Sequence, residues 1–117
     1  MLANNFPKMI AAGARLVLGT DAGISSGYTF GSADHHEIAR WVEFGLPPAD
    51  AIVAATRRPA EALGVTDAGT LEAGKRADFL VLNANPLENI RNTRQIAAVY
   101  LDGTKLDRNA LLAGWKK

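Results

Sequence analysis

The stretch LVLGTDAG, residues 16–23, decides the fold. The apolar run at residues 14–19 is bounded by Gly13 and Gly19, and such a run is typical of a buried parallel strand. The residues before it, 3–12, favour a short helix that ends in a left-handed cap at the first of these glycines. A helix, a glycine and a strand in this order predict an α/β unit.

Asp21 lies just past the carboxyl end of this predicted strand, among small residues. Active sites of α/β proteins gather at the carboxyl ends of strands, and glycine and alanine leave room for a substrate or metal ion to approach the backbone. An aspartate there can bind a metal ion or act as a general base. Aspartate after a strand is also common as a turn or cap residue, so the local pattern leaves both roles open.

The next segment predicts a glycine-rich loop followed by helices. The loop spans residues 20–32, and Asp34 and Glu37 have the spacing of a capping box at the start of a helix. Pro47-Pro48 predicts the start of a second helix, because proline is tolerated in a first helical turn. Pro59 predicts a further short helical turn.

From Val65 onward the pattern changes to short apolar runs separated by turns. Asp102-Gly103 is a strong signal for a two-residue hairpin. Residues 79–82 are apolar at every position, which predicts a strand covered on both faces. We expect strands at residues 69–71, 77–82, 96–101 and 104–106, and a terminal helix at residues 109–115.

The chemistry-bearing residues outside the loop are few. His35 and His36 are adjacent, so on a helix they point about 100° apart and cannot easily bind one metal ion together. We consider His35 a candidate for contact with a substrate, against the alternative of a solvated or capping histidine at a helix start. Asp78, before an apolar strand, is expected to hydrogen-bond in a turn and not to catalyse.

Composition excludes several classes of protein. The chain has 117 residues, 48% of them hydrophobic, and a net charge of +1, which is typical of an ordinary globular protein and not of a nucleic-acid-binding one. No apolar run is long enough to span a bilayer, so no membrane partner is expected. The sequence has no cysteine, which excludes a disulfide framework and fits a reducing, cytoplasmic location. A targeting region would be missing if the chain is a fragment.

Taken together, these segments resemble the closing third of amidohydrolase superfamily enzymes, closest to the imidazolonepropionase-like and Xaa-Pro dipeptidase-like branch. The resemblance runs from about Ala12 to Asp107. Each segment alone is a weak signal, but their shared order and spacing are strong. The segments are residues 18–23, 35–37, 43–56, 59–64, 69–82, 85–87 and 99–103.

The resemblance implies an α/β fold in which the last βα units of a TIM barrel are followed by the C-terminal half of a small β-sandwich. Residues 1–64 would be the barrel part and residues 65–117 the sandwich part. Asp21 would bind a divalent metal ion, most often zinc, and take a proton from the attacking water. The substrate of the complete enzyme would be a small amide or a dipeptide-like molecule.

The family's other metal ligands lie upstream of the region that this chain resembles. A catalytic zinc ion needs about three protein ligands, so we expect an incomplete fold that binds no metal and is inactive alone. A truncated reading frame, starting at an internal methionine, would explain this. Two alternatives stay open: a non-catalytic, β-rich module that self-associates through uncovered strands, and one half of a split hydrolase.

Overall fold

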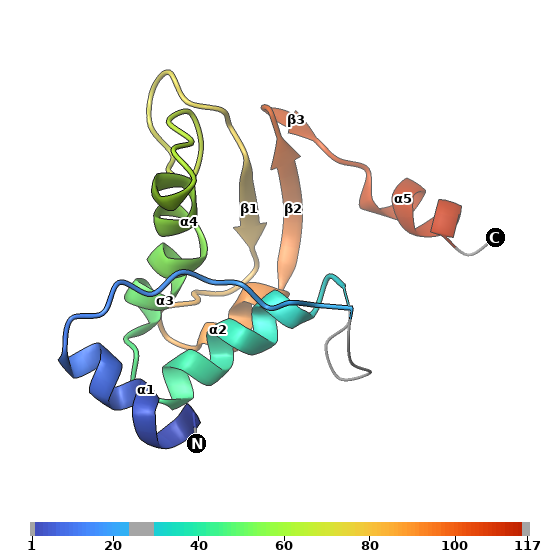
Figure 1. Cartoon of the computed structure of the whole chain (residues 1–117). Coiled ribbons are helices and arrows are strands. Elements are labelled where there is room, and N and C mark those ends of the chain that lie inside the picture. The colour runs from blue at the N-terminus through green and yellow to red at the C-terminus, as the bar shows by residue number, and fades with distance from the viewer. Residues whose placement is uncertain (1, 24–29, 116–117) are drawn as a thin grey trace.

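The computed structural model describes residues 2–23 and 30–115, and Figure 1 shows its helical and sheet parts. Residues 24–29 of the predicted glycine-rich loop lie outside the described residues. The helices are α1 (Leu2–Ala11), α2 (Ala33–Glu43), α3 (Pro48–Ala55), α4 (Arg57–Ala62), the 3-10 helix η1 (Ile90–Arg94) and α5 (Arg108–Trp115). The strands are β1 (Phe79–Leu82), β2 (Ile96–Leu101) and β3 (Thr104–Lys105).

The helices share one apolar core. Phe6 of α1 lies against Trp41 of α2, with ring centroids 5.5 Å apart. Ala51 and Ala54 of α3 are completely buried, and their small side chains allow neighbouring segments to pack closely against α3. Ile90 extends the core into η1, so the helical part packs against the segment that joins β1 to β2. The buried members are Phe6, Leu16, Ile38, Ala39, Trp41, Leu46, Ala51, Ala54 and Ile90.

The predicted strand at residues 14–19 is wrong for this chain, because no strand forms there. A strand requires a hydrogen-bonded neighbour, and the three strands of the described chain lie in a separate antiparallel sheet. The apolar pattern still decides the packing: Leu16 is buried and Leu18 packs against the core. The Leu18 amide donates to the carbonyl oxygen of Ala54 at 2.9 Å, which fixes the segment against α3.

The predicted helices form, but some of their starts differ. α2 begins at Ala33 with Ser32 as its N-cap, so the predicted capping box of Asp34 and Glu37 is wrong. Glu37 accepts a hydrogen bond from the indole nitrogen of Trp41 instead, at 2.9 Å. α3 begins at Pro48 as predicted, whereas α4 begins at Arg57, two residues before the predicted start at Pro59.

The three strands form a sheet of order β1-β2-β3. The hairpin at Asp102-Gly103 is confirmed, with φ angles of 49° and 75° that a type I′ turn requires. The predicted strand at residues 69–71 is wrong, because this segment forms bends. The prediction that both faces of residues 79–82 are covered is also wrong: Leu80 is 48% exposed and Val81 is 41% exposed.

The segment at residues 69–71 turns sharply because Gly69 has a φ of +87°. A Cβ atom there would lie 2.7 Å from the Cβ atom of Ala60 and 3.0 Å from the carbonyl oxygen of Thr56. We therefore expect Gly69→Ala to lower the free energy of unfolding by about 2–5 kcal/mol, from backbone strain and overpacking combined. Urea unfolding followed by circular dichroism measures this change.

Gly64→Ala is the matched control for this substitution. Gly64 also has a positive φ, +69°, but a Cβ atom there would meet no atom within 4 Å. Its expected loss is the backbone strain alone, about 1–2 kcal/mol. Equal losses in the two variants would show that the contact with α4 does not constrain the turn.

Candidate functional site

The candidate site is built around Asp21, at the end of the extended segment that follows α1. Two contacts hold this segment: the hydrogen bond from Leu18 to Ala54, and an ion pair between Arg15 and Glu61 of α4. Asp21 itself is exposed. Contacts with α3 and α4 therefore hold the segment that leads to Asp21, and the Asp21 carboxylate lies exposed at the end of that segment.

Asp21 has a φ of 51°, in the left-handed region that side chains other than glycine rarely adopt. Within the described ranges, Asp102 is the other such residue, with a φ of 49°, and its hairpin turn explains that conformation. Asp21 directly precedes a turn at residues 22–23. Backbone strain of this kind costs of order 1 kcal/mol and concentrates at functional sites, which supports a functional role for the residue.

Among residues 2–23 and 30–115, no hydrogen bond or ion pair engages the Asp21 carboxylate. Its oxygens are therefore free to bind a metal ion or to accept a proton. These same residues contain no group of three or more His, Asp or Glu side chains that could hold a metal ion. The donor set in this part of the chain thus fits one ligand of a metal site, not a complete site.

His35 is half-buried and lies at the contact between α2 and η1. Its Nδ1 atom is 3.1 Å from the hydroxyl oxygen of Thr93. That hydroxyl donates its hydrogen to the carbonyl oxygen of Ile90 at 2.9 Å, so the imidazole Nδ1 must donate to Thr93. Burial lowers the pKa of His35, and the charge of Arg94 lowers it further.

His36 makes a second contact with η1. The guanidinium of Arg94 lies 2.7 Å from His36 Nε2 through its Nη1 atom. An arginine can only donate, so Nε2 of His36 accepts. Thr93 and Arg94 could not be predicted from the sequence as partners of the histidines, because each lies 58 residues from its histidine and no local spacing links them.

Asp78 has the structural role that was predicted for it. Its Oδ1 atom accepts a hydrogen bond from the amide of Asp102 at 2.7 Å, and its other oxygen lies 3.6 Å from the guanidinium of Arg76. The carboxylate thus holds the hairpin turn against the start of β1. It is not available as a base.

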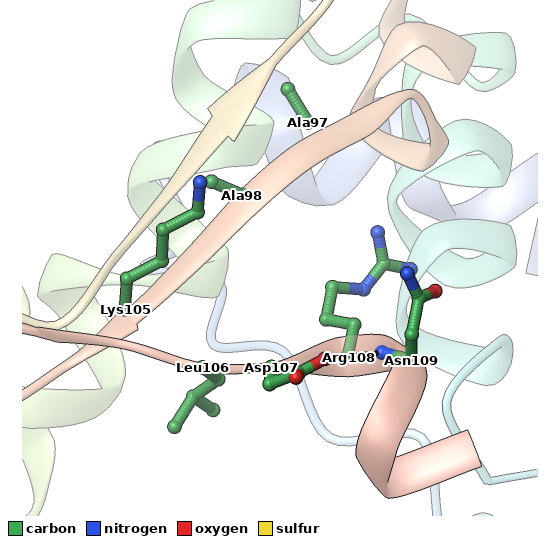
Figure 2. Close-up of a pocket in the computed structure, with 7 residues that line it drawn as sticks. All are labelled: Ala97, Ala98, Lys105, Leu106, Asp107, Arg108 and Asn109. Atoms are coloured by element: carbon green, nitrogen blue, oxygen red, sulfur yellow. Dashed lines mark hydrogen bonds between the residues drawn. The ribbon is translucent and has the colours of Figure 1, made fainter. Parts of the chain in front are cut away.

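A hollow of about 430 Å³ lies beside β2, and Asp21 is not among the residues that line it (Figure 2). It occupies the side of β2 where β3 pairs only with Tyr100 and Leu101, so the start of β2 has no strand partner there. Arg108 partly fills this position, because its guanidinium donates to the carbonyl oxygen of Ile96 at 2.9 Å. The lining residues are Ala97, Ala98, Lys105, Leu106, Asp107, Arg108 and Asn109.

Within the same described ranges, no helix is both long enough and apolar enough to cross a membrane.

Comparison with known proteins connects this architecture to one family. The profile described as "Amidohydrolase family" matches residues 3–106. Imidazolonepropionase from Deinococcus radiodurans is 38% identical over 102 residues, covering 85% of this chain and 25% of that protein. The chain spans about a quarter of the length of the curated imidazolonepropionases that it matches.

Solved structures give the same result. Phenylurea hydrolase B superposes with a TM-score of 0.86 at 36% identity, covering 94% of this chain and 28% of that chain. A Xaa-Pro dipeptidase with bound methionine superposes with a TM-score of 0.79 at 31% identity, covering 90% and 25%. The resemblance inferred from the sequence is confirmed, and the observed mixed α/β fold corresponds to about a quarter of these structures. The chain belongs to the amidohydrolase family.

Proposed function

We propose that this chain forms the closing part of a metal-dependent hydrolase that cleaves carbon–nitrogen bonds in small amide or dipeptide-like substrates. Residues 1–64 would complete the barrel and residues 65–117 the small β-sandwich. The observation that carries the proposal is Asp21, an exposed carboxylate that the described residues leave unpaired and whose backbone has a positive φ angle. The names of the relatives, imidazolonepropionase and Xaa-Pro dipeptidase among them, support the substrate class.

In this proposal Asp21 has two roles, as a metal ligand and as the base that takes a proton from the attacking water. Both roles use carboxylate oxygens that the described residues leave unpaired. A divalent metal ion, with zinc as our first choice, would supply Lewis acidity when bound. The fixed contacts of Leu18 and Arg15 would hold the carboxylate in position, which reduces the reorganisation needed during the reaction.

His35 remains a proposed substrate contact. Its Nδ1 atom is engaged by Thr93, so Nε2 is the ring nitrogen that a substrate would meet. A hydrogen bond through Nδ1 fixes the tautomer and the orientation of the ring. The same bond gives His35 a structural role that does not depend on any substrate.

The proposal predicts that the purified chain neither retains zinc after dialysis nor hydrolyses amide substrates. The reason is the ligand set: one carboxylate is fewer than the three protein ligands of a catalytic zinc site. Zinc content measured by atomic emission, together with an assay on dipeptide and anilide substrates, checks both statements. Stoichiometric zinc that survives dialysis would contradict the prediction.

The positive arm of the same experiment is a chimera. Here the chain replaces the matching C-terminal part of phenylurea hydrolase B, to which it is 36% identical. We expect the chimera to bind metal and to turn over substrate. A chimera that folds but stays inactive and free of metal would favour the alternative, a self-associating module.

Three exposed side chains support this alternative of a self-associating module. Leu80, Val81 and Leu101 are all large, apolar and exposed on the sheet.

A further inference from the structure

We propose that the contact between α2 and η1 is pH-sensitive: it forms fully only while His36 is neutral, and it weakens when the pair His35–His36 takes up a proton. Two hydrogen bonds from adjacent residues of α2 reach adjacent residues of η1. They join a helix at residues 33–43 to a turn at residues 90–94. The inference does not depend on the proposed function.

His36 is the residue whose hydrogen bond is lost on protonation. Its Nε2 atom accepts from the Arg94 guanidinium at 2.7 Å, and it can do so only through an unprotonated lone pair. A proton on Nε2 removes that acceptor and places two positive charges in contact. Protonation of His36 at Nε2 would therefore weaken the contact between α2 and η1 in two ways, through the lost hydrogen bond and through repulsion between His36 and Arg94.

His35 responds differently. Its Nδ1–H donates to Thr93, and this bond survives when a proton is added at Nε2. The cost of the added charge comes from partial burial of the ring and from Arg94. Thr93 is itself buried, 8% exposed, and is the buried polar residue of the described core.

The neighbouring charges favour a neutral His35 on balance. Arg94 and His36 disfavour a charge on His35, and Asp34 opposes them more weakly than Arg94 does. The remaining charged residues of α2 and η1 have other partners: Glu37 binds Trp41, Arg40 lies over the ring of Phe44, and Glu43 pairs with Arg91. Lys8 of α1 and Asp50 of α3 are not among the groups acting on His35.

The sign of the effect follows from proton linkage. A histidine whose pKa is lowered in the folded state binds fewer protons there than in the unfolded state, so stability rises with pH. The contribution of His35 is fully present above the unfolded pKa and is lost as the pH falls through the folded value.

The test is the urea unfolding midpoint of the full chain at about pH 8 and about pH 5.5, the range in which histidine titrates. The wild-type midpoint is expected to fall with pH. His36→Gln keeps a neutral acceptor for Arg94, and Arg94→Gln removes the opposing charge. Each variant is expected to reduce the pH-dependent fall of the midpoint.

Arg91→Gln is the matched control, because Arg91 lies on the same 3-10 helix but pairs with Glu43. Arg91→Gln should leave the pH-dependent fall of the urea unfolding midpoint unchanged. Ring nitrogen chemical shifts of the wild type above about pH 8 give an independent readout, with the hydrogen of His36 expected on Nδ1. The proposal would be overturned if the unfolding midpoint fell equally with pH in the wild type and in all three variants. It would also be overturned if neutral His36 carried its hydrogen on Nε2.

Discussion

Asp21→Asn in the active chimera is expected to lower kcat by about 10²–10⁴-fold while the fold survives. Asparagine keeps the shape of the side chain and tolerates the φ of 51° at this position. It lacks the negative charge and most of the basicity that metal binding and proton transfer need. Turnover is to be measured together with metal content and the circular dichroism spectrum, so that loss of chemistry is separated from loss of structure.

Asp78→Asn and Asp102→Asn are the controls for this experiment. The first substitution keeps a side-chain oxygen that can accept from the Asp102 amide, and the second introduces a residue that tolerates the positive φ of the hairpin. Both are expected to change kcat less than about threefold, because neither carboxylate is placed to act as a base. Near-normal turnover of Asp21→Asn with full metal content would show that Asp21 is a turn residue.

The features that the sequence predicted correctly depend on local signals. The Asp102-Gly103 turn sets its own backbone geometry, and the strands on either side of it form as expected. α3 begins at Pro48 because proline in a first turn requires no partner elsewhere in the chain.

The features that it predicted wrongly depend on partners far along the chain. Residues 14–19 have the composition of a buried strand, but a strand needs a neighbour, and in the described chain the segment binds α3 through Leu18 instead. The hydrogen bonds of His35 and His36 to η1 could not be predicted, because a separation of 58 residues leaves no periodic signal.

The candidate site was predictable in part. Asp21 was found from its place after an apolar segment, and that place holds even though the segment is not a strand. The contacts that position it, Arg15 with Glu61 and Leu18 with Ala54, join segments more than thirty residues apart and come from the packing of the helices. The position of a candidate carboxylate can therefore be predicted from the local sequence pattern. The contacts that hold it in place cannot be predicted in this way.

Trp41→Ala is expected to lower the free energy of unfolding by about 3–5 kcal/mol, the usual cost of removing a large aromatic side chain from a core. Trp41 is 7% exposed, lies 5.5 Å from the ring of Phe6, and donates from its indole nitrogen to Glu37. The substitution therefore leaves a cavity and removes a hydrogen bond together. Urea unfolding followed by circular dichroism measures the loss.

Because small domains are stable by only about 5–15 kcal/mol, this loss removes from about one fifth to all of the stability of such a domain. Trp41→Phe is the matched control: it keeps an aromatic ring against Phe6 but cannot donate to Glu37, and a loss of about 1–2 kcal/mol is expected. If Trp41→Ala cost less than about 1 kcal/mol, α1 and α2 would not share the core described above, and the support of the Asp21 segment by that core would fail with it.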